Sequence, residues 1–326
     1  MSEYDKRVYY QVFEIEKDKR KLNMHFYKNG NYSVCIMNDG TKIRKTEDNE
    51  FNPSFAENVD VKITSNCSVG CPFCYEGCTK EGKHGDLFNY RFIDTLHPYT
   101  EMALNGNDMN HPDLERLLVF LKGKKVFANI TVHQSQFMKN YETLKRYAED
   151  KLVYGIGVSY SHYDEEFIKR VKEFPNAVLH TINGILTKED INQLKGKDLK
   201  VLILGYKNLQ RGKEYFTKHV ADYFKNRNYL YVHLPEIINE KWFKLISFDN
   251  LAIEQLVVKR LLSEDEWEEF YMGDDGNFTF YIDMVAGKFA KNSLSQDRFD
   301  IGDKSIDEMF ELIRNNKKTE KNETEN

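Results

Sequence analysis

The sequence predicts an α/β protein built on a parallel sheet, with a β-rich segment before it and a mixed segment after it. Three observations lead to this fold class. From residue 60 onward, short apolar runs alternate with amphipathic runs at regular spacing. Residues 4–55 instead hold strand-like runs separated by turn residues, and the last third of the chain mixes both kinds. Hydrophobic residues make up 40% of the 326, which is enough for a sizeable core.

The central part of the chain holds six strand–helix repeats. Strands are expected at 60–64, 101–104, 126–132, 153–159, 177–182 and 199–204. Helices are expected at 87–96, 113–121, 137–148, 165–173 and 214–224, with a further helix opened by a capping box of Thr187 and Asp190. The strands read as apolar on both faces, which indicates parallel strands with right-handed crossovers. The repeat fits a partial barrel, a complete barrel or an open doubly wound sheet.

The segment before these repeats reads as a small antiparallel sheet. The turn pairs Asn29-Gly30 and Asp39-Gly40 separate strand-like runs at 23–27, 32–37 and 41–44. This spacing is typical of a hairpin or meander. Residues 49–59 contain Pro53 and polar side chains and are expected to link the two parts. A first domain is therefore placed at 1–55.

The last third of the chain predicts an α+β extension. A hairpin is expected from the runs that flank Ala286-Gly287, and Ser263 with Glu266 is a candidate helix cap. Further elements are expected as strands at 229–234 and 243–248 and helices at 250–262 and after Ser305. Residues 315–326 are all polar and are expected to be disordered. The remaining domain boundaries are therefore placed at 56–250, 251–314 and 315–326.

The charge balance bears on the class of partner. The chain has 47 Lys and Arg against 52 Asp and Glu, a net charge of −5. Strong nucleic-acid binders carry a basic excess, so a polynucleotide substrate is disfavoured against a peptide or a small molecule. No run is long and apolar enough to predict a membrane span, and the first ten residues do not resemble a signal peptide. The sequence therefore predicts a cytoplasmic protein without a membrane partner.

The cysteines predict a metal site. Four of the five, Cys67, Cys71, Cys74 and Cys78, fall within twelve residues, while Cys35 stands apart. Such clustering, with an odd total, argues against a disulfide framework. The run Cys67-Ser-Val-Gly-Cys71-Pro-Phe-Cys74 has the spacing C-x3-C-x2-C. Three thiolates can hold three corners of an iron–sulfur cube and leave one iron open, whereas a structural zinc site would need Cys78 as fourth ligand.

This run resembles the C-x3-C-x-aromatic-C signature of the radical S-adenosylmethionine (SAM) superfamily, with Phe73 at the aromatic position. The resemblance implies a partial (β/α)6 TIM-like barrel with a β-rich N-terminal extension and an α+β C-terminal extension. It also implies a 4Fe–4S cluster on Cys67, Cys71 and Cys74, with SAM as second cofactor. In that family a reduced cluster cleaves SAM to a 5′-deoxyadenosyl radical, which abstracts hydrogen from substrate. The electron comes from an external donor such as flavodoxin or ferredoxin.

The resemblance further implies where SAM is held. The family's Gly-Gly-Glu motif after the second strand aligns with Asn105-Gly106-Asn107, where Asn replaces the acidic residue. A polar residue at the end of the fourth strand corresponds to Ser159. The family's Gly-x-Ile-x-Gly run corresponds to 180–184 and keeps Ile182 and Gly184. The end of the sixth strand, at Gly205, corresponds to a further adenine contact.

Two alternatives remain open at this point. The departures from the family's second motif favour a non-catalytic binding module that keeps the fold. A single cluster also suits an activase for a glycyl-radical enzyme. The substrate is not identified by the sequence, since a fold does not fix its function.

Overall fold

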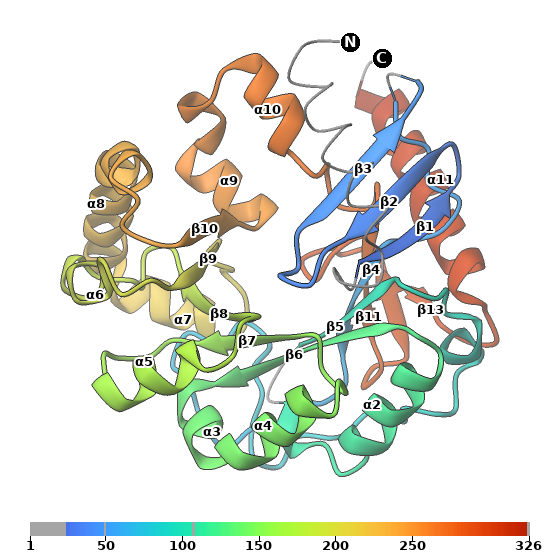
Figure 1. Ribbon diagram of the computed structural model, residues 1–326, viewed down its shortest axis with the longest axis horizontal. Coiled ribbons are helices and arrows are strands. Elements are labelled where there is room, and N and C mark those ends of the chain that lie inside the picture. Colours follow the sequence, from blue (N-terminus) through green and yellow to red (C-terminus); the bar gives the residue numbers. More distant parts are fainter. Residues whose placement is uncertain (1–23, 49, 106–107, 325–326) are drawn as a thin grey trace. The chain divides into compact units, whose positions relative to one another are not determined.

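The computed structural model describes residues 24–48, 50–105 and 108–324 and divides into two compact units. The first unit is Met1–Phe55 and the second is Ala56–Asn326. Figure 1 shows both units, and each is described by itself.

The first unit is a three-stranded antiparallel meander of β1 (His25–Asn29), β2 (Tyr32–Ile36) and β3 (Lys42–Thr46). Gly30 and Gly40 make the two turns with positive φ angles of 59° and 90°, a conformation that glycine adopts at little cost. The predicted meander is confirmed. The start of the predicted first strand, and all residues before it, lie outside the described residues.

Asn29 ties the first turn to the end of this unit. Its side-chain nitrogen donates to the Phe55 carbonyl at 2.9 Å and to the Tyr32 hydroxyl at 3.1 Å. Its side-chain oxygen accepts from the backbone N–H groups of Ser54 and Phe55. Because both ends of this buried amide are satisfied, residues 54–55 are held against the turn.

The second unit is built on a ten-stranded sheet of order β10-β9-β8-β7-β6-β5-β4-β11-β12-β13. Its strands are β4 (Asn58–Lys62), β5 (Glu101–Asn105), β6 (Phe127–His133), β7 (Gly155–Ser159), β8 (Ala177–Ile182), β9 (Lys200–Leu204), β10 (Leu245–Phe248), β11 (Thr279–Asp283), β12 (Lys288–Ala290) and β13 (Phe299–Asp300). Strands β4 to β10 are parallel to their neighbours, β11 is parallel to β4, and β12 and β13 are antiparallel. All six predicted strands of the central repeat are present. The fold is a partial TIM-like barrel, as expected.

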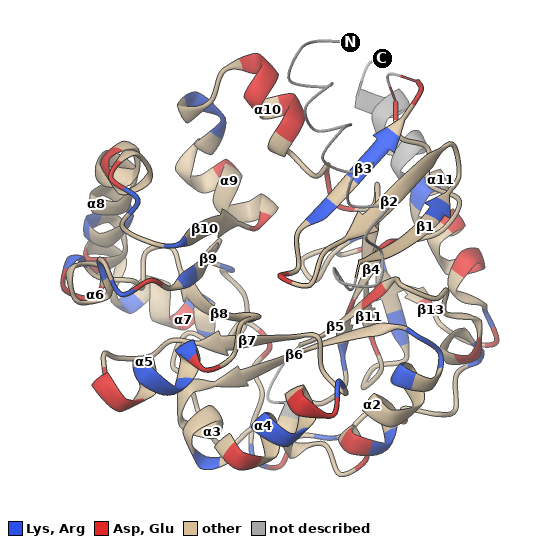
Figure 2. Ribbon diagram, in the orientation of Figure 1, with Lys and Arg blue, Asp and Glu red and all other residues tan. Residues whose placement is uncertain are grey.

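Helices lie between the strands of this sheet and after its last strand (Figure 1). They are α2 (Leu114–Gly123), α3 (Gln134–Lys139), α4 (Tyr141–Glu149), α5 (Glu165–Lys172), α6 (Lys188–Leu194), α7 (Arg211–Lys218), α8 (Val220–Asn239), α9 (Asn250–Leu256), α10 (Glu264–Phe270) and α11 (Ile306–Thr324), with short 3-10 turns η1 (Arg91–Thr95), η2 (Asp108–Asn110) and η3 (Val258–Leu261). The predicted capping boxes at Thr187 and Ser263 are confirmed. Figure 2 shows both signs of charge on the outer helices α4 and α5. No helix among the described residues is long and apolar enough to cross a membrane.

Three predicted elements are wrong. Residues 229–234 are not a strand but the middle of α8, because Leu230, Leu234 and Ile237 recur at helical spacing and are buried. The helix expected at 87–96 shortens to the five-residue turn η1. The tail expected to be disordered from residue 315 continues α11 as far as Thr324.

The C-terminal segment belongs to the same compact unit as the central repeat. The hairpin expected around Ala286-Gly287 is confirmed as β11 and β12. Strand β11 also pairs with β4 from Thr279–Asn58 to Asp283–Lys62, so it extends the parallel sheet at its first strand. The region expected to form a separate extension from residue 251 is thus partly a continuation of the barrel.

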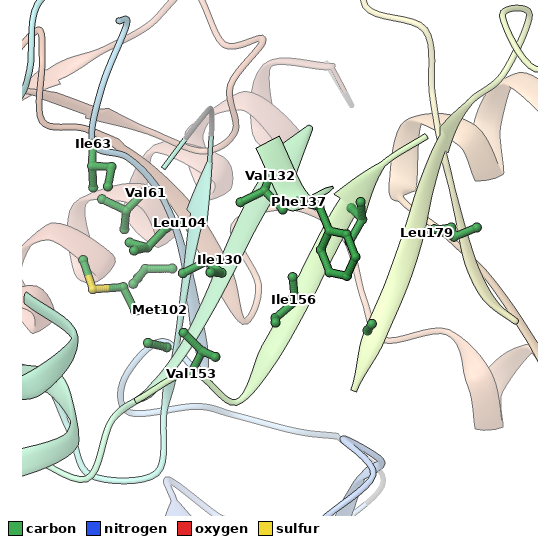
Figure 3. Close-up of a cluster of buried hydrophobic side chains, with 14 of the residues drawn as sticks. Val61, Ile63, Met102, Leu104, Ile130, Val132, Phe137, Val153, Ile156 and Leu179 are labelled. Carbon is green, nitrogen blue, oxygen red and sulfur yellow. The ribbon is translucent and has the colours of Figure 1, made fainter. Parts of the chain in front are cut away.

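Strands β4 to β7 are apolar on one face only, which corrects the prediction for them, whereas β8 and β9 carry apolar residues such as Ile182, Leu202 and Leu204 on the second face as well, as predicted. One face of β4 to β9 packs under the helices, and Figure 3 shows Val61, Leu104 and Ile130 pointing from three neighbouring strands into this core. Side chains alternate along a strand, so the other face carries the residues between. In β4 to β7 that face is largely polar, and its polar members, together with His180 of β8, are Asn58, Asp60, Lys62, Glu101, Asn105, Asn129, Thr131, His133 and Ser159. A polar face is typical of a sheet that surrounds a ligand rather than a packed barrel core.

Candidate functional site

The cysteine loop begins directly after β4, at the carboxyl end of the parallel strands. An antiparallel bridge pairs Thr64 with His84, so the loop leaves and returns as a short hairpin, and a parallel bridge pairs Asn66 with Thr79 within the loop. The Cys67 N–H donates to the Thr79 carbonyl at 2.7 Å, and the Cys74 N–H donates to the Cys71 carbonyl at 3.2 Å. These bonds fix the backbone on which the thiols stand. Ligand sites of parallel α/β sheets lie at this edge.

Close packing of two glycines holds the hairpin together. A Cβ on Gly82 would lie 1.9 Å from the Ser65 carbonyl oxygen, and a Cβ on Gly85 would lie 2.9 Å from the Met284 carbonyl carbon. No side chain fits at either contact, since the neighbouring atoms are backbone at Gly82 and the Cβ and backbone of Met284 at Gly85. The two strands of the hairpin and the loop after β11 therefore touch through their main chains.

Gly82→Ala is expected to destabilise the protein by about 1–3 kcal/mol, because the Ser65 backbone must move to admit the methyl group. Thermal unfolding measures the change. Gly123→Ala is the matched control, since a Cβ there meets nothing within 4 Å at the end of α2, and it is expected to be neutral or slightly stabilising. Equal unfolding temperatures for the two variants would contradict this account of the hairpin.

The thiols of the loop interact with one another. Cys67, Cys71 and Cys74 are all half-buried, and Cys78 is buried. Burial raises the pKa of Cys71, and the charges of Cys74 and Cys67 raise it further. A hydrogen bond with the Cys78 side chain lowers the pKa of Cys74 to about 5, and the same bond raises the pKa of Cys78. The fourth cysteine thus lies against the third ligand candidate of the motif.

A second group of side chains faces the loop from β4, β11 and β9. Lys62 lies between the carboxylates of Glu76 and Asp283, with its ammonium 3.5 Å from the Asp283 oxygen. Lys207, just after β9, donates to the Ser293 hydroxyl at 2.8 Å, and its ammonium lies 4.2 Å from the centre of the Tyr75 ring. Because β9 and β4 are five strands apart in the sheet, Lys207 links opposite sides of the barrel.

Side-chain hydrogen bonds also connect the two ends of the sheet where the partial barrel is open. Asp275, which precedes β11, accepts from Asn250 at the start of α9 and from Asn292 after β12, each at 2.7 Å. These bonds join the β10 end of the sheet to its β11–β12 end, which no strand pairing connects among the described strands. Side chains therefore hold the partial barrel closed at this edge.

The polar face holds two further titratable groups that sequence reasoning did not single out for a role. Burial raises the pKa of Asp60 to about 6, although the charge of Lys207 opposes the shift. Burial lowers the pKa of His180 to about 4, so this imidazole is neutral at pH 7. Gly157 makes room for the ring, since a Cβ there would lie 2.2 Å from the His180 Cε1 atom. Both side chains keep some accessible surface, so both can meet a ligand.

The residues predicted to contact SAM lie along the same edge where they are described. Asn105, Ser159 and Ile182 are the last residues of β5, β7 and β8, and each is half-buried. Gly106 and Asn107 lie outside the described residues. The ring of Phe73 packs edge-on against Tyr215 of α7 at 5.7 Å between centroids.

Two predicted adenine contacts have an internal role as well. A Cβ on Gly184 would lie 2.2 Å from the Tyr223 ring, and one on Gly205 would lie 2.4 Å from Leu251. The Gly205 N–H also donates to the Asp249 carboxylate at 2.8 Å. Close packing by α8 and α9 therefore requires these glycines, and their contact with a cofactor stays a prediction.

Arg211 is a site residue that sequence reasoning missed. It is the first residue of α7, and its guanidinium donates to the carbonyls of Cys71 and Cys78 at 3.1 and 2.9 Å. A signal was present, because a cationic side chain at a helix N-terminus faces the positive end of the helix dipole and so calls for another partner.

Among the described residues, no three His, Cys, Asp or Glu side chains stand in an arrangement set to hold a single metal ion. A cavity of about 290 Å³ lies elsewhere, between the segment after β12 and helix α11.

Comparisons with known proteins place this geometry among known folds. No family model matches the sequence, and no curated protein matches it. Two crystal structures of SuiB from Streptococcus suis, one bound to S-adenosylmethionine and one bound to the precursor peptide SuiA, are similar to the chain. The chain shares its fold with SuiB. The TM-scores are 0.56 and 0.58 at 12% identity, and each match covers 89% of this chain and 89% of SuiB.

The residues on the cysteine loop fit an iron–sulfur cluster. Three thiols stand on one loop within electrostatic reach of each other, and the Arg211 guanidinium lies beside them to offset negative charge. Thiolate is the ligand that such clusters require. The chemistry of the donor set therefore agrees with the resemblance on which the cluster was expected.

Proposed function

We propose that this chain is a radical SAM enzyme that acts on a peptide. The observation that carries the proposal is the position of the C-x3-C-x2-C loop. It directly follows the first strand of a SuiB-like partial barrel and meets the polar face of that barrel at one edge. A structural zinc loop has no need of a polar sheet face beside it.

The cysteine loop would bind the cluster, and the ends of the strands would bind SAM. Cys67, Cys71 and Cys74 would hold the cluster and leave one iron for SAM. When bound, the cluster supplies the electron that cleaves SAM to methionine and a 5′-deoxyadenosyl radical, which takes a hydrogen atom from substrate. Lys62, held between Glu76 and Asp283, keeps the start of the loop in place beside the polar face.

The polar strand ends would position SAM. Asn105 and Ser159 offer amide and hydroxyl groups at the same edge as the loop. The resemblance assigns the same role to Gly106 and Asn107, which lie outside the described residues. Ile182, Gly184 and Gly205 would supply an apolar contact and close backbone for the adenine. Phe73, braced by Tyr215, fixes the turn between Cys71 and Cys74.

Two observations support a peptide as the substrate class. The structural neighbour SuiB is bound to a precursor peptide in one of its crystal structures. The net charge of −5 also disfavours a polynucleotide. The electron would come from an external donor such as flavodoxin or ferredoxin, since the five cysteines are too few for a second cluster beside the first.

Anaerobic reconstitution with iron and sulfide, followed by incubation with SAM and dithionite, tests this proposal. Wild-type protein is expected to bind about four irons and four sulfides per chain, as one cube requires, and to release 5′-deoxyadenosine. Bound iron and sulfide with SAM binding but no 5′-deoxyadenosine would instead indicate a binding module that keeps the fold. Bound zinc without sulfide would overturn the proposal altogether.

A further inference from the structure

The start of helix α7 is built against the cysteine loop. Besides the two bonds from Arg211, a Cβ on Gly212 would lie 2.6 Å from the Lys207 carbonyl oxygen and 3.3 Å from that of Phe73. The Gln210 side chain lies over Gly77, since a Cβ on Gly77 would meet the Gln210 Cβ at 3.4 Å, an ordinary contact distance. The first turn of α7 therefore touches the loop from Cys71 to Cys78 along most of its length.

The local backbone is unfavourable unless these contacts form. Gln210 caps α7 with a φ of 47° and a ψ of −129°, a conformation that side-chain-bearing residues rarely adopt. Arg211 then places a positive charge at the positive end of the helix. Strained backbone of this kind persists where surrounding structure holds it and concentrates at functional sites.

The geometry of Arg211 suits a clamp. Its Nε atom binds the Cys71 carbonyl and its Nη1 atom binds the Cys78 carbonyl, so one planar group holds both ends of an eight-residue segment. Cys74 lies between these ends, and its N–H is tied back to Cys71. A planar guanidinium can make two such bonds in a fixed geometry, whereas a lysine ammonium acts as a single point charge.

The same group acts on the thiols by its charge. The Arg211 guanidinium donates to the carbonyls of Cys71 and Cys78, so its positive charge stands beside the segment that carries the thiols of Cys71 and Cys74. A fixed positive charge favours whichever state of a neighbouring group is more negative. A cluster held by these thiolates gains one negative charge on reduction, so the guanidinium would favour its reduced form.

We propose that Arg211 is the positioning residue of the cysteine loop, which holds the Cys71–Cys78 segment for cluster binding and raises the reduction potential of the bound cluster. This inference rests on the proposed function, because it assigns a residue to the cluster that the function requires. Nothing in the radical SAM resemblance placed a role at this position.

The test compares Arg211→Gln and Arg211→Lys with wild type in three measurements. Amide hydrogen exchange of residues 67–78 is measured in cluster-free protein, and cluster loss to a chelator and the reduction potential are measured after reconstitution. Arg260→Gln is the matched control, since Arg260 also donates to a backbone carbonyl, that of Tyr231, in the same unit. All four proteins are first compared by circular dichroism and thermal unfolding.

Arg211→Gln is expected to lose its cluster about 10- to 100-fold faster than wild type, the usual effect of removing a partner that orients metal ligands. Its loop should exchange faster, and its cluster should have a more negative potential. Arg211→Lys should exchange and lose cluster faster than wild type while keeping a potential close to it, because the charge stays and the two-point bond is lost. Arg260→Gln should match wild type in all three.

If Arg211→Gln has the same amide hydrogen exchange, rate of cluster loss and reduction potential as wild type, the inference is overturned. Faster amide hydrogen exchange with an unchanged reduction potential would overturn the part of the inference that concerns the charge of Arg211. If Arg211→Gln does not fold, Arg211→Lys carries the same comparison. If wild type takes up no iron and sulfide, the proposed function fails, and the exchange of cluster-free protein still decides whether Arg211 holds the loop.

Discussion

Replacing Cys67, Cys71 and Cys74 together by alanine should abolish cluster binding and reduce 5′-deoxyadenosine formation on the order of 10³-fold or more. The reason is that all three thiols stand on one loop with no other cysteine in the unit except Cys78. The fold should survive, because the three side chains are half-exposed and do not belong to the apolar core of the unit. Iron and sulfide analysis with the SAM cleavage assay measures the loss.

Two single variants sharpen this result. Cys35→Ala removes a buried thiol on β2 of the first unit and should leave iron content and SAM cleavage at wild-type levels. Cys78→Ala should keep the wild-type ratio of iron to sulfide, because a three-thiolate cluster does not use the fourth cysteine. Loss of all metal in Cys78→Ala, with zinc rather than iron bound by wild type, would contradict the three-ligand prediction and favour a closed four-ligand site.

The sequence contains enough information to place the cysteine loop but not to identify the distant residues that contact it. Local spacing shows four cysteines after a short strand, and the structure puts that loop at the carboxyl edge of β4. Arg211 and Lys207 reach the loop from more than 130 residues away. Such contacts depend on how β9 and β4 face each other across the barrel, which no local pattern encodes.

The prediction that strands β4 to β7 are apolar on both faces failed for a different reason. Five-residue strands such as Asn58–Lys62 carry two or three apolar residues, and a count of apolar residues predicts burial on both sides. Reading the same strand with a period of two separates Val59 and Val61 from Asp60 and Lys62. The polar face was therefore present in the sequence at the level of single positions.

Helix α8 shows why a helix can be mistaken for a strand in the sequence when the segment is rich in aromatic residues. Residues 229–234 include Tyr229, Tyr231 and Val232, which favour strands by propensity. The buried positions Leu230 and Leu234 are four residues apart and pack in the core of the unit. Tertiary packing of one helical face outweighs the strand propensity of the exposed side chains.

Asp60 is a polar-face carboxylate that is buried with little support for its negative charge. The one hydrogen bond to its carboxylate within the described residues comes from the Asn58 amide at a long 3.4 Å, and the charge of Lys207 also favours the ionised form. Burial outweighs both, so the pKa of Asp60 rises from 3.8 to about 6. An unfavourably buried carboxylate at a site is typical of a group kept for ligand binding rather than for stability.

Asp60→Asn is therefore expected to stabilise the ligand-free protein above pH 6, by up to about 3 kcal/mol. The sign follows from the two pKa values. Between pH 4 and pH 6 the folded state holds the Asp60 proton more tightly than the unfolded state does, so wild-type stability falls as pH rises through this window. The asparagine variant lacks that loss. The difference in unfolding free energy between the two proteins should be smallest below pH 4 and should level off above pH 6.

Denaturant unfolding of both proteins from pH 4 to pH 8 measures this difference, and Asp94→Asn serves as the control substitution at an exposed aspartate. A stability difference that is constant with pH would show that Asp60 is not held against its charge. The same variant bears on function in the opposite direction. If the polar face takes SAM or a substrate, Asp60→Asn should gain stability without ligand and lose affinity with it, because a group that costs folding free energy is retained only where binding uses it.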